Sequence, residues 1–181
     1  MLDVGRRLAS QGLTVAIPDL PGQSESLVLT EDARLPSWRR AFADCAASLP
    51  GPVHVAAWRG GALVDIEADV SSRWYLAPLS GAAVVRDLHR VRSAAGLPAA
   101  AGAVSEYAGN LVHRDLLPEL DGAEPTTAGP LRVVRLATDP RPADAKLPGP
   151  ALWRRAEPST DGALQAALAT DLARWVMACG G

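Results

Sequence analysis

The sequence is poor in aromatic residues, in cysteine and in long apolar runs, and each scarcity excludes a class of protein. Aromatic side chains make up only 4% of the 181 residues, so the core has to be built mainly from Leu, Val and Ala. The two cysteines, Cys45 and Cys179, have neither metal-ligand spacing nor the pattern of a disulfide framework. The absence of any run of about 18 apolar residues predicts no membrane span. The first residues lack the apolar core of a signal peptide, so we expect a cytoplasmic location.

Excess charge of one sign is also missing, and histidine is rare. The 18 Lys and Arg residues nearly balance the 20 Asp and Glu residues, which gives a formal net charge of -2. Such a balance provides no bulk attraction for nucleic acid, so we expect no nucleic-acid partner. The three histidines belong to no set of His, Cys, Asp and Glu with ligand spacing. We therefore expect no metal and no cofactor.

The apolar residues that are present, 48% of the chain, form alternating strand-like and helix-like segments. Short apolar runs predict strands, whereas apolar residues three and four apart predict amphipathic helices. The expected strands are 13–17, 53–57, 74–76, 131–137 and 150–154. The expected helices are 2–11, one carrying Leu35, Trp38, Phe42 and Cys45, 62–68, one carrying Val84, Val85, Leu88 and Val91, and a closing helix that Asp161 caps and Gly180 stops.

This alternation predicts an α/β fold in a single domain over residues 1–181, with a mostly parallel sheet flanked by helices on both faces. Residues 98–129 interrupt the alternation. They are irregular, apart from a helix-like stretch around 115–120. We expect this segment to form a lid or cap over the carboxyl-terminal edge of the sheet.

Two strand-to-loop junctions carry a family resemblance. The motif Asp19-x-Pro21-Gly22-x-Ser24-x-Ser26 resembles the D-x-P-G-x-G-x-S passage of α/β hydrolases, with Ser24 in place of the second Gly. Residues 53–62 resemble the nucleophile elbow of the same proteins, in which a strand ends in a sharp G-x-S-x-G turn that opens a helix. The two junctions occur in the order and at about the distance that this fold requires.

Four further stretches are similar to the exosortase A system-associated hydrolase 2 family. Residues 76–81 resemble its W-x-P-x-x-S-G segment, with Leu76 in place of the Trp, and residues 107–111 resemble its A-G-Y-x-L segment, with Asn110 in place of the Tyr. The other two are residues 133–140 and the G-P-x-x-W stretch at 149–153. The resemblance implies an α/β-hydrolase fold that lacks its N-terminal strands.

The residues that catalysis would need are missing from the matching positions. In the elbow frame that the family favours, Arg59 stands where the nucleophilic serine belongs, while a frame shifted by one places Trp58 there. The catalytic histidine would fall in 154–160, where the chain has Glu157 and no His. Asp139 matches the acid of the triad, although a turn residue before proline is the alternative interpretation.

Other serines and histidines do not replace the missing pair. Ser24, Ser26 and Ser80 lie on expected loops and have no evident base to activate them. The three histidines are interpreted as structural or solvated side chains, in a strand, on a helix face and beside the lid helix: His54, His89 and His113.

The sequence therefore predicts a non-catalytic protein of this family that binds a ligand or a partner. The alternative is an esterase or acyl transferase with an unconventional active site, in which Arg59, Asp139 and Glu157 occupy the catalytic positions. A fragment without independent activity is a third interpretation. The expected ligand is a small anionic or acyl compound, and a protein partner or a second chain that donates a strand is also consistent.

Arg59 carries a specific expectation. A cation at a helix N-terminus is disfavoured by roughly 0.3–1 kcal/mol, so a carboxylate should compensate it, and Asp139 and Glu157 are the candidates. With the backbone amides of Gly60 and Gly61, Arg59 would then form an anion site. The alternative is an arginine that points into solvent.

The position of Met1 gives the last expectation. In the α/β-hydrolase fold, the helix matched by 2–11 follows a strand that lies between the strands matched by 13–17 and 53–57. Three arrangements are open: a preceding segment with Met1 internal to it, a second chain donating the strand, or a rearranged sheet. We favour the first and predict that 13–17 and 53–57 do not pair; regular pairing between them would show that the shortened chain closes its own sheet.

Overall fold

The computed structural model describes residues 2–151, 153 and 160–180. Its α-helices are α1 (Leu2–Ala9), α2 (Leu35–Ser48), α3 (Gly81–Ala94), α4 (Leu116–Asp121) and α5 (Gly162–Ala178). Its strands are β1 (His54–Trp58), β2 (Ser72–Leu76), β3 (Val104–Tyr107), β4 (Asn110–His113), β5 (Leu131–Leu136) and β6 (Ala145–Leu147). Short 3-10 helices lie at η1 (Thr30–Asp32), η2 (Arg59–Leu63) and η3 (Asp65–Glu67).

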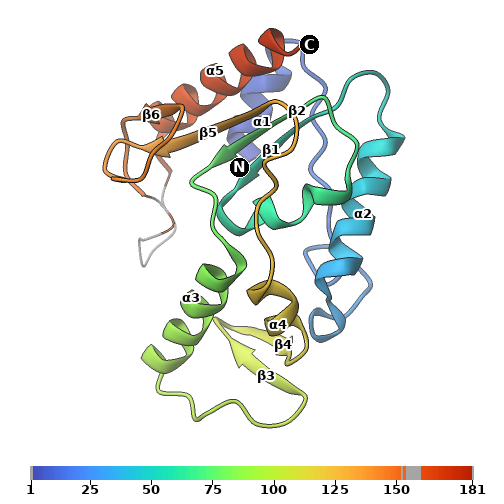
Figure 1. Ribbon diagram of the computed structural model, residues 1–181, viewed down its shortest axis with the longest axis vertical. Helices are drawn as coiled ribbons and strands as arrows, with labels where there is room; N and C mark the ends of the chain where they lie inside the picture. The colour runs from blue at the N-terminus through green and yellow to red at the C-terminus, as the bar shows by residue number, and fades with distance from the viewer. Residues whose placement is uncertain (1, 152, 154–159, 181) are drawn as a thin grey trace.

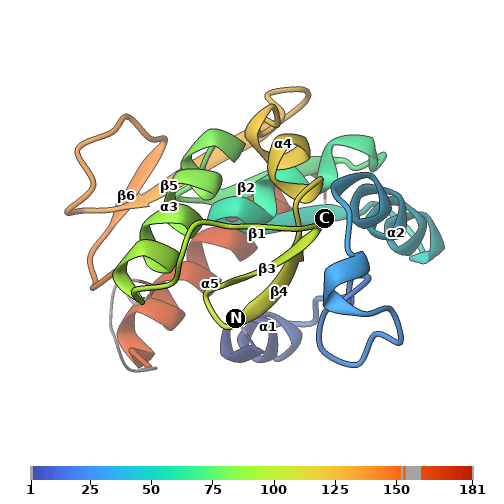
Figure 2. The same ribbon diagram turned by 90° about the horizontal axis from the view of Figure 1, so that it is seen from below.

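A parallel sheet of four strands in the order β1-β2-β5-β6 organises the upper part of the molecule (Figure 1). Helices α1 and α5 pack together on one face, where they enclose the larger core cluster (Figure 2). The other face packs against Phe42 of α2 and Ala62 of η2. The α/β class with a mostly parallel sheet and helices on both faces is therefore confirmed.

Strand β2 is the centre of the fold, and all five of its residues are buried. Trp74 and Leu76 face α1 and α5, whereas Tyr75 packs on the opposite face with Val55 and Ala57 of β1. Strands of parallel sheets alternate their side chains between two covered faces, so neither face of β2 contacts solvent. Its one charged residue, Arg73, therefore needs a partner inside the protein.

Asp65 is that partner. Its side chain is fully buried, and Arg73 Nε donates to Asp65 Oδ2 at 2.9 Å while the Tyr75 hydroxyl donates to Asp65 Oδ2 at 2.7 Å. Burial raises the pKa of Asp65, and the hydrogen bond from Tyr75 and the charge of Arg73 oppose that rise. Burial beside Asp65 also raises the pKa of Tyr75. The cluster joins η3 to the middle of the sheet.

A second polar cluster ties α5 to the sheet. Asp171 accepts a hydrogen bond from Trp74 Nε1 at 2.8 Å and two from Arg132 of β5, at 2.9 and 2.8 Å. Burial would raise the pKa of Asp171, but the hydrogen bonds from Arg132 and Trp74 outweigh it and lower the pKa. The predicted cap of this helix is confirmed, since Leu164 N–H donates to Asp161 Oδ1 at 2.9 Å.

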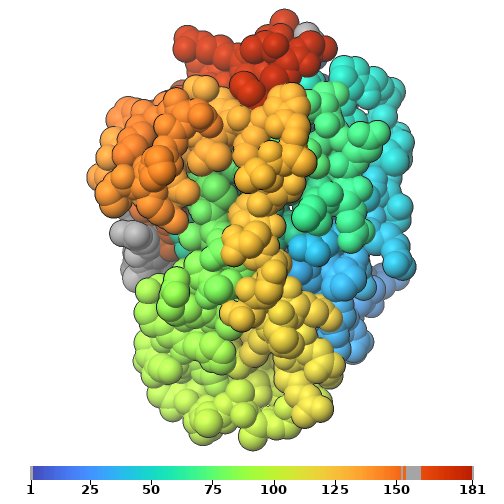
Figure 3. All heavy atoms as spheres, in the orientation of Figure 1, coloured from blue at the N-terminus to red at the C-terminus, as the bar shows by residue number. Residues whose placement is uncertain are grey.

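Residues 98–129 extend beyond the sheet, at the lower end of the molecule in Figure 1. They form the antiparallel hairpin β3–β4 and the short helix α4, which packs against α3. The close approach of α4 requires glycine at position 81, because a Cβ there would lie 1.5 Å from the carbonyl oxygen of Leu120. Figure 3 shows the chain after α4 crossing this face as a column that leads back to the sheet. The lid role of this segment stays a prediction.

Several local expectations are wrong. Residues 13–17 form no strand, although the expectation that they do not pair with β1 is confirmed. The described residues of 150–154 do not form a strand. The fourth strand of the sheet is β6, which ends before Pro148, Gly149 and Pro150. The helix expected at 62–68 is two 3-10 turns.

Among the described residues, no helix has the length and apolar character needed to cross a membrane.

Candidate functional site

The turn that ends β1 has the backbone shape expected of the elbow. Arg59 follows the last strand residue with a φ of 51°, in the left-handed region that few residues other than glycine adopt. Such a conformation costs on the order of 1–3 kcal/mol and persists only where its surroundings impose it. The crowding is visible at the next residue, since a Cβ on Gly60 would lie 3.0 Å from Val84 of α3.

The side chain of Arg59 is held by α3 and by the segment before α5. Its Nη2 lies 3.1 Å from Oδ2 of Asp87, and its guanidinium lies 5.2 Å from the centre of the Trp153 ring. A carboxylate therefore does compensate this cation, as expected; among the described residues it is Asp87 and not Asp139. Asp87 lies among charged residues on α3, one of which, Arg90, also contacts it at 3.0 Å. In the sequence it was indistinguishable from an ordinary polar helix face.

Asp139, the predicted partner, is engaged by two other arginines. Arg141 Nη2 lies 2.7 Å and Arg135 Nη1 lies 3.2 Å from Asp139 Oδ2. The hydrogen bond from Arg141, together with both positive charges, lowers the pKa of Asp139 well below its usual range. Asp139 is thus a firmly ionised carboxylate in an ion-pair cluster after β5. Glu157, the other candidate, lies outside the described residues.

The loop serines act as backbone acceptors. Ser26 Oγ accepts hydrogen bonds from the N–H groups of Gly22 and Val28, at 3.1 and 3.2 Å. Ser80 Oγ caps α3 by accepting from Ala83 N–H at 3.3 Å. Ser24 lines a cavity described below and has a φ of 44°.

The histidines have structural contacts. His54 Nδ1 lies 2.8 Å from the hydroxyl of Ser72, which is fully buried. Its other ring nitrogen, Nε2, is buried without a hydrogen-bond partner, and burial lowers the pKa of His54. His113 Nδ1 accepts from the N–H of Asp115, and His89 packs edge-on against Tyr107. Ser72–His54 is the one serine–histidine hydrogen bond found among the described residues.

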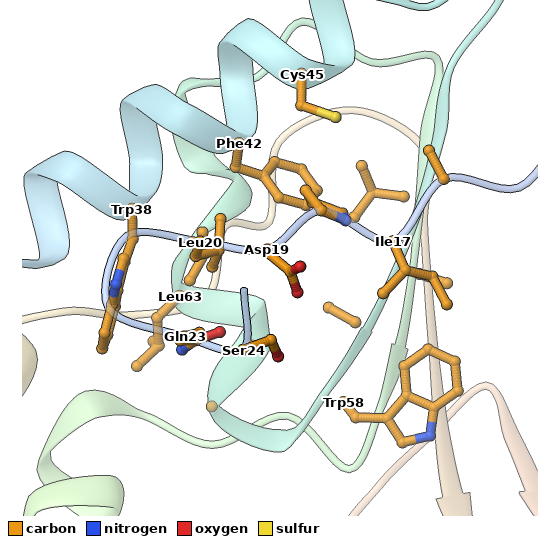
Figure 4. A pocket seen from close by; sticks show the side chains of 18 of the residues that line it. Ile17, Asp19, Leu20, Gln23, Ser24, Trp38, Phe42, Cys45, Trp58 and Leu63 are labelled. Atoms are coloured by element: carbon orange, nitrogen blue, oxygen red, sulfur yellow. The ribbon is translucent and has the colours of Figure 1, made fainter. Parts of the chain in front are cut away.

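A cavity of about 1430 Å³ runs along the outer edge of β1. All five residues of β1 line it, and so do residues 13–20, of which Ile17, Asp19 and Leu20 are labelled in Figure 4. Trp38, Phe42 and Cys45 of α2 border it on one side. Leu172 and Val176 of α5 also line it, and so do residues of the hairpin and α4, which are Tyr107, Ala108, Asn110, Val112, Leu116 and Leu120.

The residues predicted to form one anion site do not all line the cavity. Gly60 and Gly61 are among its lining residues, but the side chain of Arg59 is directed to Asp87 and Trp153 instead. The 3-10 helix that begins at Arg59 has only five residues, so it lacks the macrodipole on which the anion argument depended. The one charged side chain labelled inside the cavity in Figure 4 is Asp19, which is negative.

Within the part of the chain that the structure describes, no group of three or more His, Cys, Asp and Glu residues is placed to hold a metal ion. No protein-family model and no curated protein matches the chain. The family resemblance of the sequence motifs therefore stands on the motifs alone.

Proposed function

We propose that this chain is a non-catalytic binding protein with an α/β-hydrolase-like fold, of the exosortase A system-associated hydrolase 2 type. One observation carries the proposal: Arg59 occupies the left-handed turn after β1, and its side chain is tied to Asp87 and Trp153. A nucleophile would have to project from this turn toward a substrate. An arginine held in an ion pair supplies no nucleophile and acts as a structural bridge.

The esterase alternative lacks a usable pair of groups. The Ser72–His54 hydrogen bond has the length of a serine–base contact, but Ser72 is fully buried at the start of β2, out of reach of any substrate. Asp139 is neutralised by arginines rather than hydrogen-bonded to a histidine. A binding role therefore fits these residues better than turnover.

The cavity beside β1 is the proposed binding site. Its walls carry aliphatic and aromatic side chains from β1, α2 and segment 13–20, which favours an apolar occupant. An apolar ligand or an apolar segment of a partner is better supported than a small anion, because Arg59 is turned away from the cavity.

Ester hydrolysis tests the non-catalytic half of the proposal. The chain should release p-nitrophenol from p-nitrophenyl acetate and butyrate no faster than buffer does, and Arg59→Ala and Asp139→Asn should behave in the same way. Circular dichroism and thermal melting show that each variant is folded. A rate above buffer that disappears in either variant would overturn the proposal in favour of the esterase.

The uncharged, polarity-sensitive fluorescent probe N-phenyl-1-naphthylamine tests the binding half. The folded chain should bind it with enhanced fluorescence, and Gly61→Leu should weaken that signal by filling one end of the cavity. Position 61 has room for a side chain, since a Cβ there meets only Ala57, at 3.9 Å. The matched control is Gly162→Leu at the start of α5, where a Cβ meets nothing within 4 Å. Equal fluorescence of both variants would remove the cavity as the binding site.

A further inference from the structure

The outer edge of β1 exposes backbone hydrogen-bonding groups to the cavity. Among the described residues, β1 pairs with β2 and with no other strand. On the far side of β2, Arg73 N–H donates to Pro130 O at 2.9 Å and Ala77 N–H donates to Val134 O at 2.8 Å. Because alternate residues of a parallel strand bond to opposite neighbours, the even-numbered residues of β2 bond to β1.

The register then identifies the free groups of β1. Val55 lies opposite Arg73 and Ala57 opposite Tyr75, so Val55 and Ala57 supply the bonds to β2. The residues whose N–H and C=O groups point to the cavity are His54, Ala56 and Trp58. Edges that proteins keep free of strand partners are usually guarded by lysine, proline or a bulge. The sequence of β1, HVAAW, contains neither lysine nor proline, and its register with β2 is continuous, without a bulge.

A second segment that lines the cavity has a strand-like sequence. Residues 13–17 are assigned to no helix, turn or strand and are apolar apart from Thr14, yet Val15 is 38% and Ile17 is 46% exposed. Such a sequence has the composition of a buried strand and the exposure of a loop. It lines the same cavity as β1, so two segments border whatever lies in the cavity (Figure 4).

The two faces of this gap are covered. On one face, Ala56 and Trp58 pack with the core that α1 and α5 enclose; on the other, Val55 and Ala57 pack with Phe42 of α2. An extended segment entering the gap would be buried on both faces, as strands of parallel sheets are, and would therefore need a continuous aliphatic run. To match the five residues of β1 it would span about 17 Å, at roughly 3.3 Å per residue.

We propose that the cavity is a docking groove for an extended aliphatic peptide segment of another polypeptide, which adds to the edge of β1 as a further strand. The inference deepens the proposed binding function and rests on it. Backbone hydrogen bonds to β1 would give the affinity, and the apolar walls would select Val, Ile, Ala and Leu side chains over charged ones.

The probe is a soluble peptide with a run of about six alternating Val and Ala residues between paired lysines, long enough to match β1. Its control differs only in that one central residue is replaced by proline, which removes an N–H and interrupts extended pairing. Hydrogen exchange of the full chain, read residue by residue by NMR, is measured with each peptide. The Val–Ala peptide should slow exchange of the His54, Ala56 and Trp58 amides by roughly tenfold or more, and the proline peptide should not.

Two variants separate backbone pairing from simple apolar contact. Ala56→Pro removes one outward N–H of an edge position and should abolish protection by the peptide. Ala56→Ser keeps the N–H and should retain it. Thermal melting shows whether each variant is folded; if Ala56→Pro does not fold, the comparison of the two peptides on the natural chain decides the question.

Each remaining outcome contradicts the docking groove in a different way. Probe fluorescence in the cavity without any amide protection by the peptide would overturn strand addition while leaving an apolar binding protein. Protection of the three amides without peptide, rising with protein concentration, would assign the groove to a second copy of this chain. Ester turnover dependent on Arg59 or Asp139 would instead overturn the proposed function itself.

Discussion

Strands β1 and β2 pair with each other, but they differ in the number of paired edges, in burial and in polar contacts. Both edges of β2 are paired, all of its residues are buried, and polar clusters anchor it through Asp65 and Asp171. Among the described strands β1 has one partner, and its other edge meets a cavity. We infer that β2 stabilises the fold, whereas the outer edge of β1 is available for binding.

Two arginines repeat this contrast at the level of side chains. Arg73 of β2 and its partner Asp65 have side chains 8% and 0% exposed. Arg59, at the end of β1, and its partner Asp87 are 28% and 35% exposed. Ion pairs near solvent are screened and contribute little, whereas a buried charge that loses its partner is costly. The same residue type should therefore respond very differently to substitution at the two positions.

Substitution of Arg73 should have the largest effect. Arg73→Met leaves Asp65 buried without its cation, which is expected to destabilise the protein by about 3–5 kcal/mol. The pKa of Asp65 should rise further, because the charge that opposes the effect of burial is lost. Urea denaturation measures the free energy of unfolding. Arg141→Met is the matched control: Arg141 is 46% exposed in its pair with Asp139, and its loss should cost no more than about 1 kcal/mol. Equal losses would remove the contrast.

A pH titration should show an intermediate effect at His54. Burial lowers the pKa of this histidine in the folded protein, so below the ordinary histidine pKa of 6.5 the unfolded chain binds a proton that the folded chain resists. Stability attributable to His54 should thus be full above pH 6.5 and fall as the pH drops below it. The slope for one group has an upper limit of about 1.4 kcal/mol per pH unit. Urea denaturation between pH 7 and 5 should give a shallower decline for His54→Phe than for the natural chain. Identical declines would show that the ring is not desolvated.

The smallest effect is expected in segment 13–17. Ile17→Ser should change the free energy of unfolding by no more than about 0.5 kcal/mol, because Ile17 is 46% exposed and packs in no sheet. Leu136→Ala in β5, where Leu136 is 2% exposed, should cost about 2–5 kcal/mol. If a docked peptide covers this segment, Ile17→Ser should weaken peptide binding while leaving stability unchanged. A large loss of stability for Ile17→Ser would mean that the segment belongs to the core.

The parts of the fold that the sequence predicted are those in which periodicity and burial agree. Helix α5 with its Asp161 cap and strand β5 follow apolar spacing closely. The hairpin β3–β4 was missed because its strands have four residues each and are partly exposed. Its turn also places Ala108 at a φ of 52°, a conformation for which alanine gives no sequence signal. Strand β6 was also missed because it is short, with three residues.

In the candidate site, the turn was predictable and the contacts were not. The apolar run followed by Arg59, Gly60 and Gly61 located a sharp reversal correctly. The partner of Arg59 depended on how α3 packs over the end of β1, and a single sequence contains no information about that distance. The buried position of Asp65 was hidden in the same way, because an acidic residue in an expected helix is normally solvated.

At Arg59 two contributions to stability can be changed separately: the strain of the main chain and the ion pair of the side chain. Its φ of 51° belongs to the main chain, while the bridge to α3 belongs to the guanidinium. Glycine at this position would relieve the strain and delete the bridge together; asparagine, which tolerates the same φ, would delete the bridge and keep the chain less flexible when unfolded. A programme to raise the melting temperature would therefore begin at position 59 with asparagine and glycine side by side, and the difference between them would measure what the unfolded chain gains from glycine.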